Sequence, residues 1–300
     1  MVETPVLYIT FARPEYASQS FAAIKKAQPK KLYFYSNKAR TDRPDEVARN
    51  EEVRSYIKQI DWECEVKTWF RDEYVDVFTS LWGAIDWVFD NEEKAIIIEE
   101  DVVASLAFFD YVDKLIDKYR DNDKIWLISG NNALPDESPK GLSYFPSRWA
   151  DIYGWASWRR RWKSVDWQLS NLPKYNGSKE MRQYWGNWPM FFYMKLFYKR
   201  FFKRFTISNY NPWDSIFLLS MRIDNGYCLT PCTNLCQDIG VNGANHSQGF
   251  YSPLSIVSID EDKFTIKKEP TVIIPSEYDK MVFYKYRLLG VIRRKLRAFF

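Results

Sequence analysis

Histidine is almost absent from this sequence, since His246 is the single one among 300 residues. Zinc or iron sites built on several imidazoles are therefore excluded, and a Ser-His-Asp triad would have to include His246. We expect carboxylates to carry any catalysis. Cysteine is scarce as well: Cys64 is isolated, and Cys228, Cys232 and Cys236 are four residues apart. This spacing matches neither a paired Cys-x-x-Cys zinc pattern nor a dense disulfide framework, and it indicates reduced cysteines.

The sequence also has no long apolar run. No stretch approaches the roughly 20 apolar residues that span a membrane. The N-terminal residues Met1–Pro5 carry no basic segment, and they lead directly into the strand-like segment Val6–Phe11. We therefore expect no signal peptide, and we expect a cytoplasmic protein.

The net charge of +4 is unevenly distributed, because residues 281–300 contain six basic residues and no acid. The rest of the chain is therefore slightly acidic. Apolar residues repeat at helical spacing along this tail, which is typical of a basic amphipathic helix at an anionic membrane surface. The alternative is a terminal helix that packs on its own domain. The apolar positions are Leu288, Leu289, Ile292, Leu296 and Phe299, and the basic ones are Lys285, Arg287, Arg293, Arg294, Lys295 and Arg297.

A second basic stretch, Trp188–Phe205, has five basic residues, many aromatic residues and no acid. Lys195, Lys199 and Lys203 fall on one stripe of a helix. Such a surface could bind anionic lipid or a polyanionic acceptor, and aromatic residues beside basic ones are also typical of single-strand binding. The slightly acidic remainder of the chain argues against an extended groove for nucleic acid, so we expect no nucleic-acid partner.

The first 130 residues alternate strand-like and helix-like segments, which predicts an α/β fold with a mostly parallel central sheet flanked by helices. After Gly130 the pattern changes, and prolines and a glycine make Asn131–Arg148 loop-like. We expect one compact domain with an irregular C-terminal half. The predicted strands are Val6–Phe11, Lys31–Tyr35, Cys64–Trp69, Ala95–Ile98 and Ile125–Ser129; the predicted helices are Tyr16–Ala27, Glu46–Ile60, a segment with one apolar face from Tyr74 to Val88, Phe108–Tyr119, and one from about Asp214.

The sharpest feature is the segment Ile96–Asp101, in which three consecutive acids follow an apolar strand. Ligands of open parallel sheets bind beyond the carboxyl ends of the strands. Carboxylates crowded there repel one another, and a divalent cation such as Mn²⁺ or Mg²⁺ would compensate their charge and bridge to substrate phosphates. The alternative is a surface turn with solvated acids.

This strand with its acidic triplet resembles the Asp-x-Asp motif region of GT-A glycosyltransferases, in particular the N-acetylglucosaminyltransferase I group and its bacterial relatives. Four further segments resemble that group in order and spacing. Thr10–Pro14 is similar to its nucleotide-binding turn, and the Gly-Trp segment Tyr153–Arg159 to an acceptor-side segment. Trp213-Asp214 is similar to the element with the catalytic base, and Asn242–Ser247 to a late loop near the diphosphate.

The resemblance implies a GT-A (Rossmann-like) fold and a metal-dependent transferase that moves a sugar from a nucleotide-diphosphate donor to a glycan or lipid-linked acceptor with inversion. It implies a nucleotide-sugar-binding half over residues 1–130, an acceptor-side and catalytic half over 131–280, and the basic tail over 281–300. The implied roles are Arg13, Arg43, Glu99, Glu100 and His246 in donor binding, Asp101 as metal ligand, Asp214 as base, and Trp155 and Trp158 in acceptor binding.

Each of these residues also has a plain structural interpretation. Arg13 could be a surface residue, Asp214 could cap the helix that follows, and Trp155 and Trp158 could be core. The sequence also departs from the family pattern: the second strand ends at Asn37 where relatives often have an acid. A non-catalytic module that binds glycan or nucleotide therefore stays open as an alternative, as does a phosphoesterase or nuclease that uses the acid cluster.

Overall fold

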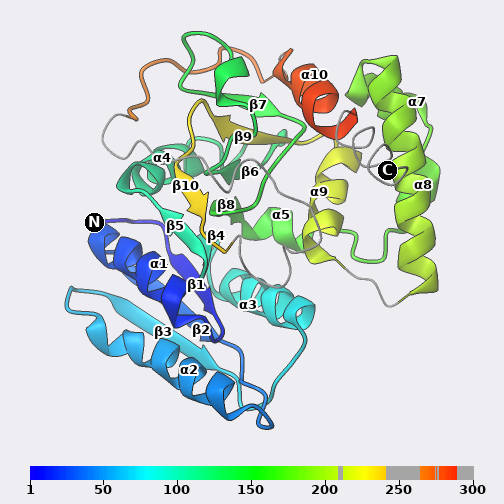
Figure 1. The fold of residues 1–300 in the computed structure, drawn as a ribbon. Helices are drawn as coiled ribbons and strands as arrows, with labels where there is room; N and C mark the ends of the chain where they lie inside the picture. Colours follow the sequence, from blue (N-terminus) through cyan, green and yellow to red (C-terminus); the bar gives the residue numbers. More distant parts are fainter. Residues whose placement is uncertain (209–211, 241–263, 274, 276, 289–300) are drawn as a thin grey trace, which may run out of the picture.

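The structure, a computed structural model, describes residues 1–208, 212–240, 264–273, 275 and 277–288. Its first half alternates strands and helices as the sequence predicts (Figure 1). The helix expected over Glu46–Ile60 ends at Ser55 and continues as a 3-10 turn over Tyr56–Gln59. The elements are β1 (Val6–Thr10), α1 (Pro14–Ala27), β2 (Lys31–Ser36), α2 (Pro44–Ser55), β3 (Glu65–Phe70), α3 (Val77–Asn91), β4 (Lys94–Glu99), β5 (Val102–Ala104), α4 (Leu106–Ile116) and β6 (Ile125–Ser129).

The second half contains more regular structure than the sequence predicts. The segment expected to be a loop, Asn131–Arg148, ends in the strand β7 (Tyr144–Ser147), so that expectation was wrong there. Pro146 lies in this strand, which is tolerated because β7 is at the edge of the sheet. The other elements are β8 (Trp155–Trp158), α5 (Arg159–Lys163), α6 (Leu172–Tyr175), α7 (Lys179–Trp185), α8 (Trp188–Ile207), α9 (Trp213–Ile223), β9 (Tyr227–Pro231), β10 (Cys236–Asp238), α10 (Tyr278–Val282) and a π-helix over Phe283–Leu288.

The described strands form an eight-stranded sheet in the order β3-β2-β1-β4-β8-β6-β9-β7 and a small sheet of β5 and β10. The neighbours β3, β2, β1 and β4 are parallel to one another. Strand β8 then runs antiparallel to both β4 and β6, so the sheet is mixed in its second half. The predicted architecture, a large α/β sheet flanked by helices, is confirmed (Figure 1).

The central strands are apolar throughout because both of their faces are covered. Alternate residues of one strand enter different cores: Leu7 and Ile97 pack with α3 and α9, whereas Tyr8 and Ile98 pack with α1 and α4. This period-two division explains why Ile96–Ile98 reads as a continuous apolar run rather than an alternating one.

The segment around α10 is anchored to the domain by a buried carboxylate. Asp279 accepts hydrogen bonds from Ser147 Oγ at 2.7 Å and from the Arg148 backbone N–H and Nη1 at 3.1 and 2.9 Å. Val282 and Phe283 are buried beside it. The start of the predicted tail is therefore packed against the domain, while residues 289–300 lie outside the described part. The domain boundaries 1–130, 131–280 and 281–300 stay predictions.

Among the helices that the structure describes, none combines the length and the apolar character needed to cross a membrane.

Candidate functional site at the carboxyl ends of β1 and β4

The acidic triplet lies beside the turn that follows β1. Strands β1 and β4 are parallel neighbours with Ile9 opposite Glu99, so the chain leaves both strands at the same edge of the sheet. The hydroxyl of Ser20 on α1 donates a hydrogen bond of 2.8 Å to the backbone oxygen of Glu100. Helix α1 thereby fixes the turn after β4 against the turn after β1, at the edge where open parallel sheets bind ligands.

Arg13 is shared between two acids of the triplet. Its Nε donates to Glu100 Oε1 at 2.6 Å, and its Nη1 lies 2.9 Å from Asp101 Oδ2. The backbone N–H of Phe11 donates to the other oxygen of Glu100 at 2.7 Å. Burial raises the pKa of Glu100, and the Arg13 guanidinium opposes that rise. Burial disfavours the charge on Arg13, yet the carboxylates of Asp101 and Glu100 raise its pKa above the usual range.

Strand β10 brings a further part of the chain to Asp101. The N–H of Ile239 donates to the backbone oxygen of Asp101 at 2.8 Å, and the N–H of Gly240 donates to Asp238 Oδ1 at 2.8 Å. A Cβ on Gly240 would lie 3.0 Å from both Cβ and Cγ of Asp101 and closer still to Oδ2. The close approach of the chain at position 240 to the Asp101 carboxylate therefore requires a residue without a side chain.

Two glycines allow β10 to approach this closely. Gly154 has a φ of +69°, and a Cβ there would collide with the Cys236 side chain; a Cβ on Gly130 would meet the same sulfur. The N–H groups of Leu235 and Cys236 both donate to the Gly130 oxygen, at 2.8 and 3.2 Å. The Gly-Trp segment of the sequence thus serves to hold β10, and with it Asp238, against the acidic triplet.

Asp214 lies in the first turn of α9. Burial raises the pKa of its carboxyl, against the effect of the Ser215 backbone N–H, which donates to Oδ1 at 2.6 Å. The preceding Trp213 stacks on Trp155 of β8 with the ring centroids 6.0 Å apart. The tryptophan pair thereby fixes the start of α9 relative to the sheet.

The electrostatics around Glu99 show that four carboxylates share one region. Burial and the Asp101 carboxylate raise the pKa of Glu99 to about 8, Arg13 lowers it, and Asp238 and Asp214 raise it further. Tyr153 belongs to the same region. Burial raises the pKa of its hydroxyl, and the nearby carboxylates of Asp238, Glu99 and Asp214 raise it further. The region is rich in buried carboxyl groups, and Arg13 lies against two of them, those of Glu100 and Asp101.

No three His, Cys, Asp or Glu side chains within the described ranges are grouped so that they could hold a metal ion between them. A single carboxylate is a sufficient protein ligand where substrate phosphates and water complete the coordination, as is common for Mg²⁺. Asp101 fits that arrangement, since its carboxylate is partly exposed and Gly240 brings no side chain against it.

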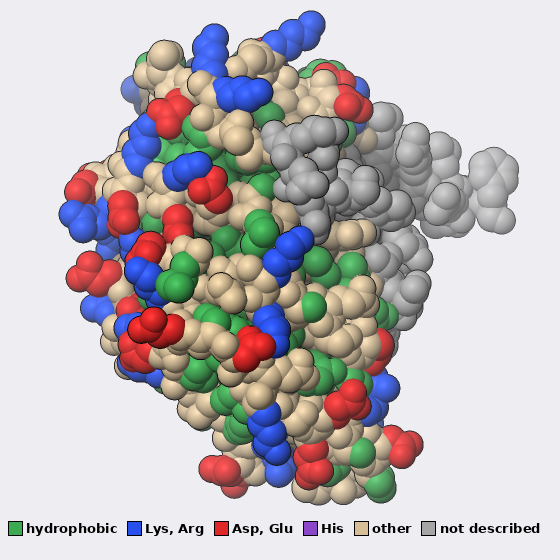
Figure 2. All heavy atoms as spheres, turned by 90° about the vertical axis from the view of Figure 1, so that its left-hand side faces the viewer, with side chains coloured by type: hydrophobic (Ala, Val, Ile, Leu, Met, Phe, Trp, Pro, Cys, Tyr) green, Lys and Arg blue, Asp and Glu red, His purple; other side chains and the backbone are tan. Residues whose placement is uncertain are grey.

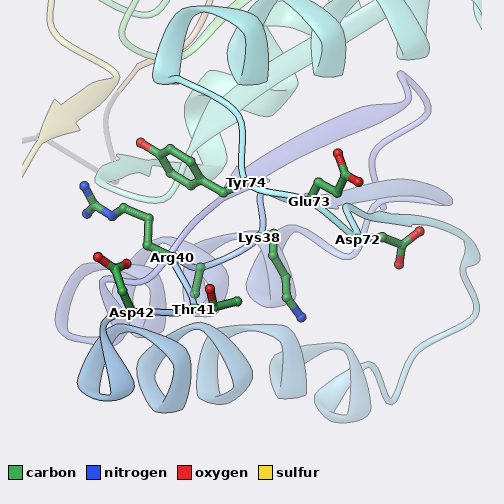
Figure 3. Close-up of a pocket in the computed structure, with 8 residues that line it drawn as sticks. Lys38, Arg40, Thr41, Asp42, Asp72, Glu73 and Tyr74 are labelled. Carbon is green, nitrogen blue, oxygen red and sulfur yellow. The ribbon is translucent and has the colours of Figure 1, made fainter.

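A pocket of about 320 Å³ lies at the carboxyl ends of the neighbouring strands β2 and β3 (Figure 3). The guanidinium of Arg40 lies over the Tyr74 ring, 5.3 Å from its centroid. Tyr74 also contacts Phe11, with the ring centroids 6.2 Å apart, so the pocket adjoins the turn that carries Arg13. The side-chain amide of Asn37, which follows β2, forms hydrogen bonds with the backbone N–H and oxygen of Val75 and so holds the segment next to Tyr74 in place. The lining residues are Lys38, Ala39, Arg40, Thr41, Asp42, Asp72, Glu73 and Tyr74.

The other sequence-predicted residues lie elsewhere. Arg43 is exposed at the start of α2, 3.9 Å from Glu46, and it does not line the pocket. Trp155 and Trp158 are buried in the two cores, which is the alternative that the sequence left open for them. His246 lies outside the described residues.

Asp238 and Tyr153 are the site residues that sequence reasoning did not single out. Asp238 ends a three-residue strand far from the acidic triplet along the chain, and no periodicity marks so short an element. Tyr153 stands in the Gly-Trp segment, where the neighbouring tryptophans are the more conspicuous aromatic residues.

Known structures with a partial likeness to the chain include enzymes of nucleotide sugars. A mannosyltransferase from Pyrobaculum calidifontis in complex with GDP-Man and Mn²⁺ matches with a TM-score of 0.35 and 11% identity over 54% of this chain and 46% of that one. Mouse xyloside xylosyltransferase 1 matches at 0.32 and 12% over 53% and 68%. A putative glucose-1-phosphate thymidylyltransferase from Bacillus anthracis matches at 0.33 and 8% over 53% and 73%. No family model and no curated protein matches the chain.

Proposed function

We propose that the chain is a metal-dependent glycosyltransferase that uses a nucleotide-diphosphate sugar as donor. The observation that supports this most is the convergence of Glu99, Glu100, Asp101 and Asp214 with Arg13 at the carboxyl ends of β1 and β4. These residues come from three separate segments, and the sequence resemblance assigns a part of this reaction to each of them.

In the proposed reaction the acceptor hydroxyl oxygen attacks the anomeric carbon of the donor while the bond to the diphosphate breaks, with inversion. Asp214 takes the hydroxyl proton. Burial raises the pKa of its carboxyl, which makes the carboxylate a stronger base. Asp101 would hold the divalent cation, which when bound neutralises charge on the departing diphosphate.

The remaining residues would bind the donor. Arg13 would contact the nucleotide of the donor, Glu100 the ribose side and Glu99 the sugar, as the sequence resemblance implies. The pocket beside Tyr74 would accept the base, since an aromatic ring and the Arg40 guanidinium offer stacking faces. Arg43 and His246 stay predicted contacts of the phosphates. Trp155 and Trp158 stay predicted contacts of the acceptor on the sequence resemblance alone, because both side chains are buried. The basic tail favours a lipid-linked acceptor at an anionic membrane surface, as in the assembly of surface polysaccharides.

A panel of sugar nucleotides, each with and without Mn²⁺, tests the proposal through thermal shift and release of nucleoside diphosphate. A ligand that binds the folded state raises the melting temperature, by an amount that grows with its concentration over Kd. We expect one class of donor to stabilise the protein only with the metal, and Asp101→Ala to remove that effect. If no donor in the panel gives stabilisation or turnover, the proposed enzymatic function is refuted.

A non-catalytic binding module is the second candidate, and the Arg13 pairing favours it. Arg13 already pairs with both Glu100 and Asp101 within the described site. A module of this kind would bind nucleotide or glycan equally well without metal, and it would release no nucleoside diphosphate from any donor. The same panel therefore separates the two functions.

A further inference from the structure

Helix α8 exposes apolar and basic side chains together on one face. Met190, Met194, Tyr198 and Phe201 face the core and hold the helix on the domain. On the outer face, Trp188, Phe192 and Leu196 succeed one another at intervals of four residues, each more than half exposed. Lys195, Lys199 and Lys203 form an exposed row of the same spacing beside them. We call these six residues the α8 outer face.

This face is positively charged along its whole length. The helix contains no acidic residue over its 20 positions. Within the described part of the chain, Lys199 and Lys203 enter no ion pair, so their charge is available to a partner. Arg182 of α7 adds a further cation, 4.4 Å above the Trp188 ring.

The opposite side of the molecule differs. Figure 1 places α8 at the far edge from α1 and α2, and Figure 2 shows the side that carries α1, with acidic and basic side chains mixed over its surface. Ion pairs are frequent on that side, for example Lys25 with Asp61 and Arg49 with Glu15. The α8 outer face therefore has a single charge sign through its own sequence and not because the whole protein is basic.

We propose that the α8 outer face binds the surface of an anionic phospholipid bilayer, with the helix parallel to the membrane plane. Trp188, Phe192 and Leu196 would enter the interface between headgroups and acyl chains, where aromatic rings are favoured. The lysines can extend their stems past this apolar row and keep their ammonium groups at the lipid phosphates.

A straight helix of 20 residues is about 30 Å long, so the apolar residues and the charges of this face can contact one flat surface at the same time. The exposed apolar row favours a membrane over nucleic acid, because a polyanion in water offers no acyl region for Leu196. The inference concerns a surface that holds none of the proposed site residues, so it does not depend on the transfer reaction.

The test is co-sedimentation of the full-length protein with phosphatidylcholine vesicles that contain or lack phosphatidylglycerol. We expect binding only to the anionic vesicles. Since one basic residue near an anionic surface contributes about fivefold to the partition coefficient, Lys199→Glu/Lys203→Glu should weaken binding by at least about 25-fold. A second variant, Phe192→Ser/Leu196→Ser, should remove the binding that persists at high salt, where the charges are screened.

Lys58→Glu/Lys124→Glu is the matched control, because both lysines are exposed, lie on other elements, and give the same change in net charge. All variants retain the basic tail, and circular dichroism with thermal unfolding verifies that they fold. Equal losses in the control and in Lys199→Glu/Lys203→Glu would show a general charge effect and overturn the inference. Equal binding to neutral vesicles, unchanged binding by the α8 variants, or displacement of the protein from vesicles by a single-stranded oligonucleotide would overturn it as well.

Discussion

Gly240→Ala gives a direct test of whether the position of the Asp101 carboxylate matters for function. An added Cβ would lie 3.0 Å from Cβ and Cγ of Asp101, whereas carbon atoms in ordinary contact are about 3.5–4.0 Å apart. The Asp101 carboxylate must therefore move by roughly 0.5–1 Å, or β10 must move instead. Because Asp101 also pairs with Arg13 at 2.9 Å, a shift of its carboxylate disturbs the Arg13 contacts too.

The expected result is a large functional loss with a small loss of stability. Overpacking at a site that can adjust costs about 1–3 kcal/mol, which lowers the melting temperature by a few degrees. A displacement of about 1 Å in a reacting assembly can cost about 100-fold in rate. We therefore expect release of nucleoside diphosphate from the selected donor to fall about 100-fold, together with the stabilisation by donor and Mn²⁺.

Gly83→Ala is the control, since its Cβ would come too close only to the end of the flexible Arg71 side chain and would make an ordinary contact with Trp69. Gly83 also lies inside α3, where alanine is favoured. It should keep full activity. A Gly240→Ala protein with unchanged metal-dependent binding and turnover would refute the role of Asp101 as metal ligand. If Gly240→Ala does not fold, Asp101→Asn, which adds no atoms, tests the role of Asp101 instead.

Three further outcomes follow from the contacts. Arg13→Ala should lower the free energy of unfolding by about 2 kcal/mol, less than for a fully buried pair because the Arg13 side chain is 34% exposed. It should also abolish donor binding in the thermal-shift assay; unchanged donor binding would exclude Arg13 from the donor site. Asp214→Asn should keep the stabilisation by donor while turnover falls at least about 100-fold, the contribution of a general base; an active variant would remove Asp214 from the role of base. Asp279→Ala leaves the nearly buried Arg148 unpaired and should cost about 3–5 kcal/mol in chemical unfolding without changing the Mn²⁺ requirement; a loss below 1 kcal/mol would show that this pair does not anchor α10.

The sequence predicted the first half of the sheet well because each of its elements has a local cause. Apolar segments define β1, β2 and β4, and an alternating segment defines β3. The apolar run of β4 that leads to Glu99 placed the acids at the carboxyl end of the sheet. The second half lacked such signals. Pro146 made the edge strand β7 look like a loop. The strand β8 is only four residues long, and its two tryptophans, which are buried in the two cores, gave no clear strand pattern.

The candidate site shows the same division between local and distant causes. Arg13 and the triplet were predictable because each directly follows an apolar strand, and parallel neighbours bring such positions together. Asp238 was not predictable, since its place depends on the close approach of β10, which in turn requires Gly130 and Gly154 to lack side chains against Cys236. The spacing of residues along the sequence does not reveal that Gly130 and Gly154 must lie against Cys236.

The shared position of Arg13 connects the two functions that remain proposed. In the described structure its guanidinium pairs with Glu100 and Asp101, so a cation that binds Asp101 competes with Arg13 for the same carboxylate. If a donor diphosphate binds together with the metal, the diphosphate can replace Asp101 as the ionic partner of Arg13. Little free energy is then lost when Asp101 binds the metal. If the metal binds without a diphosphate, Arg13 stays paired with Asp101 and the affinity for the metal is low. A transferase therefore requires Mn²⁺ affinity to rise steeply with nucleoside diphosphate, whereas a binding module shows no such coupling, and a titration of Mn²⁺ with and without diphosphate decides between them.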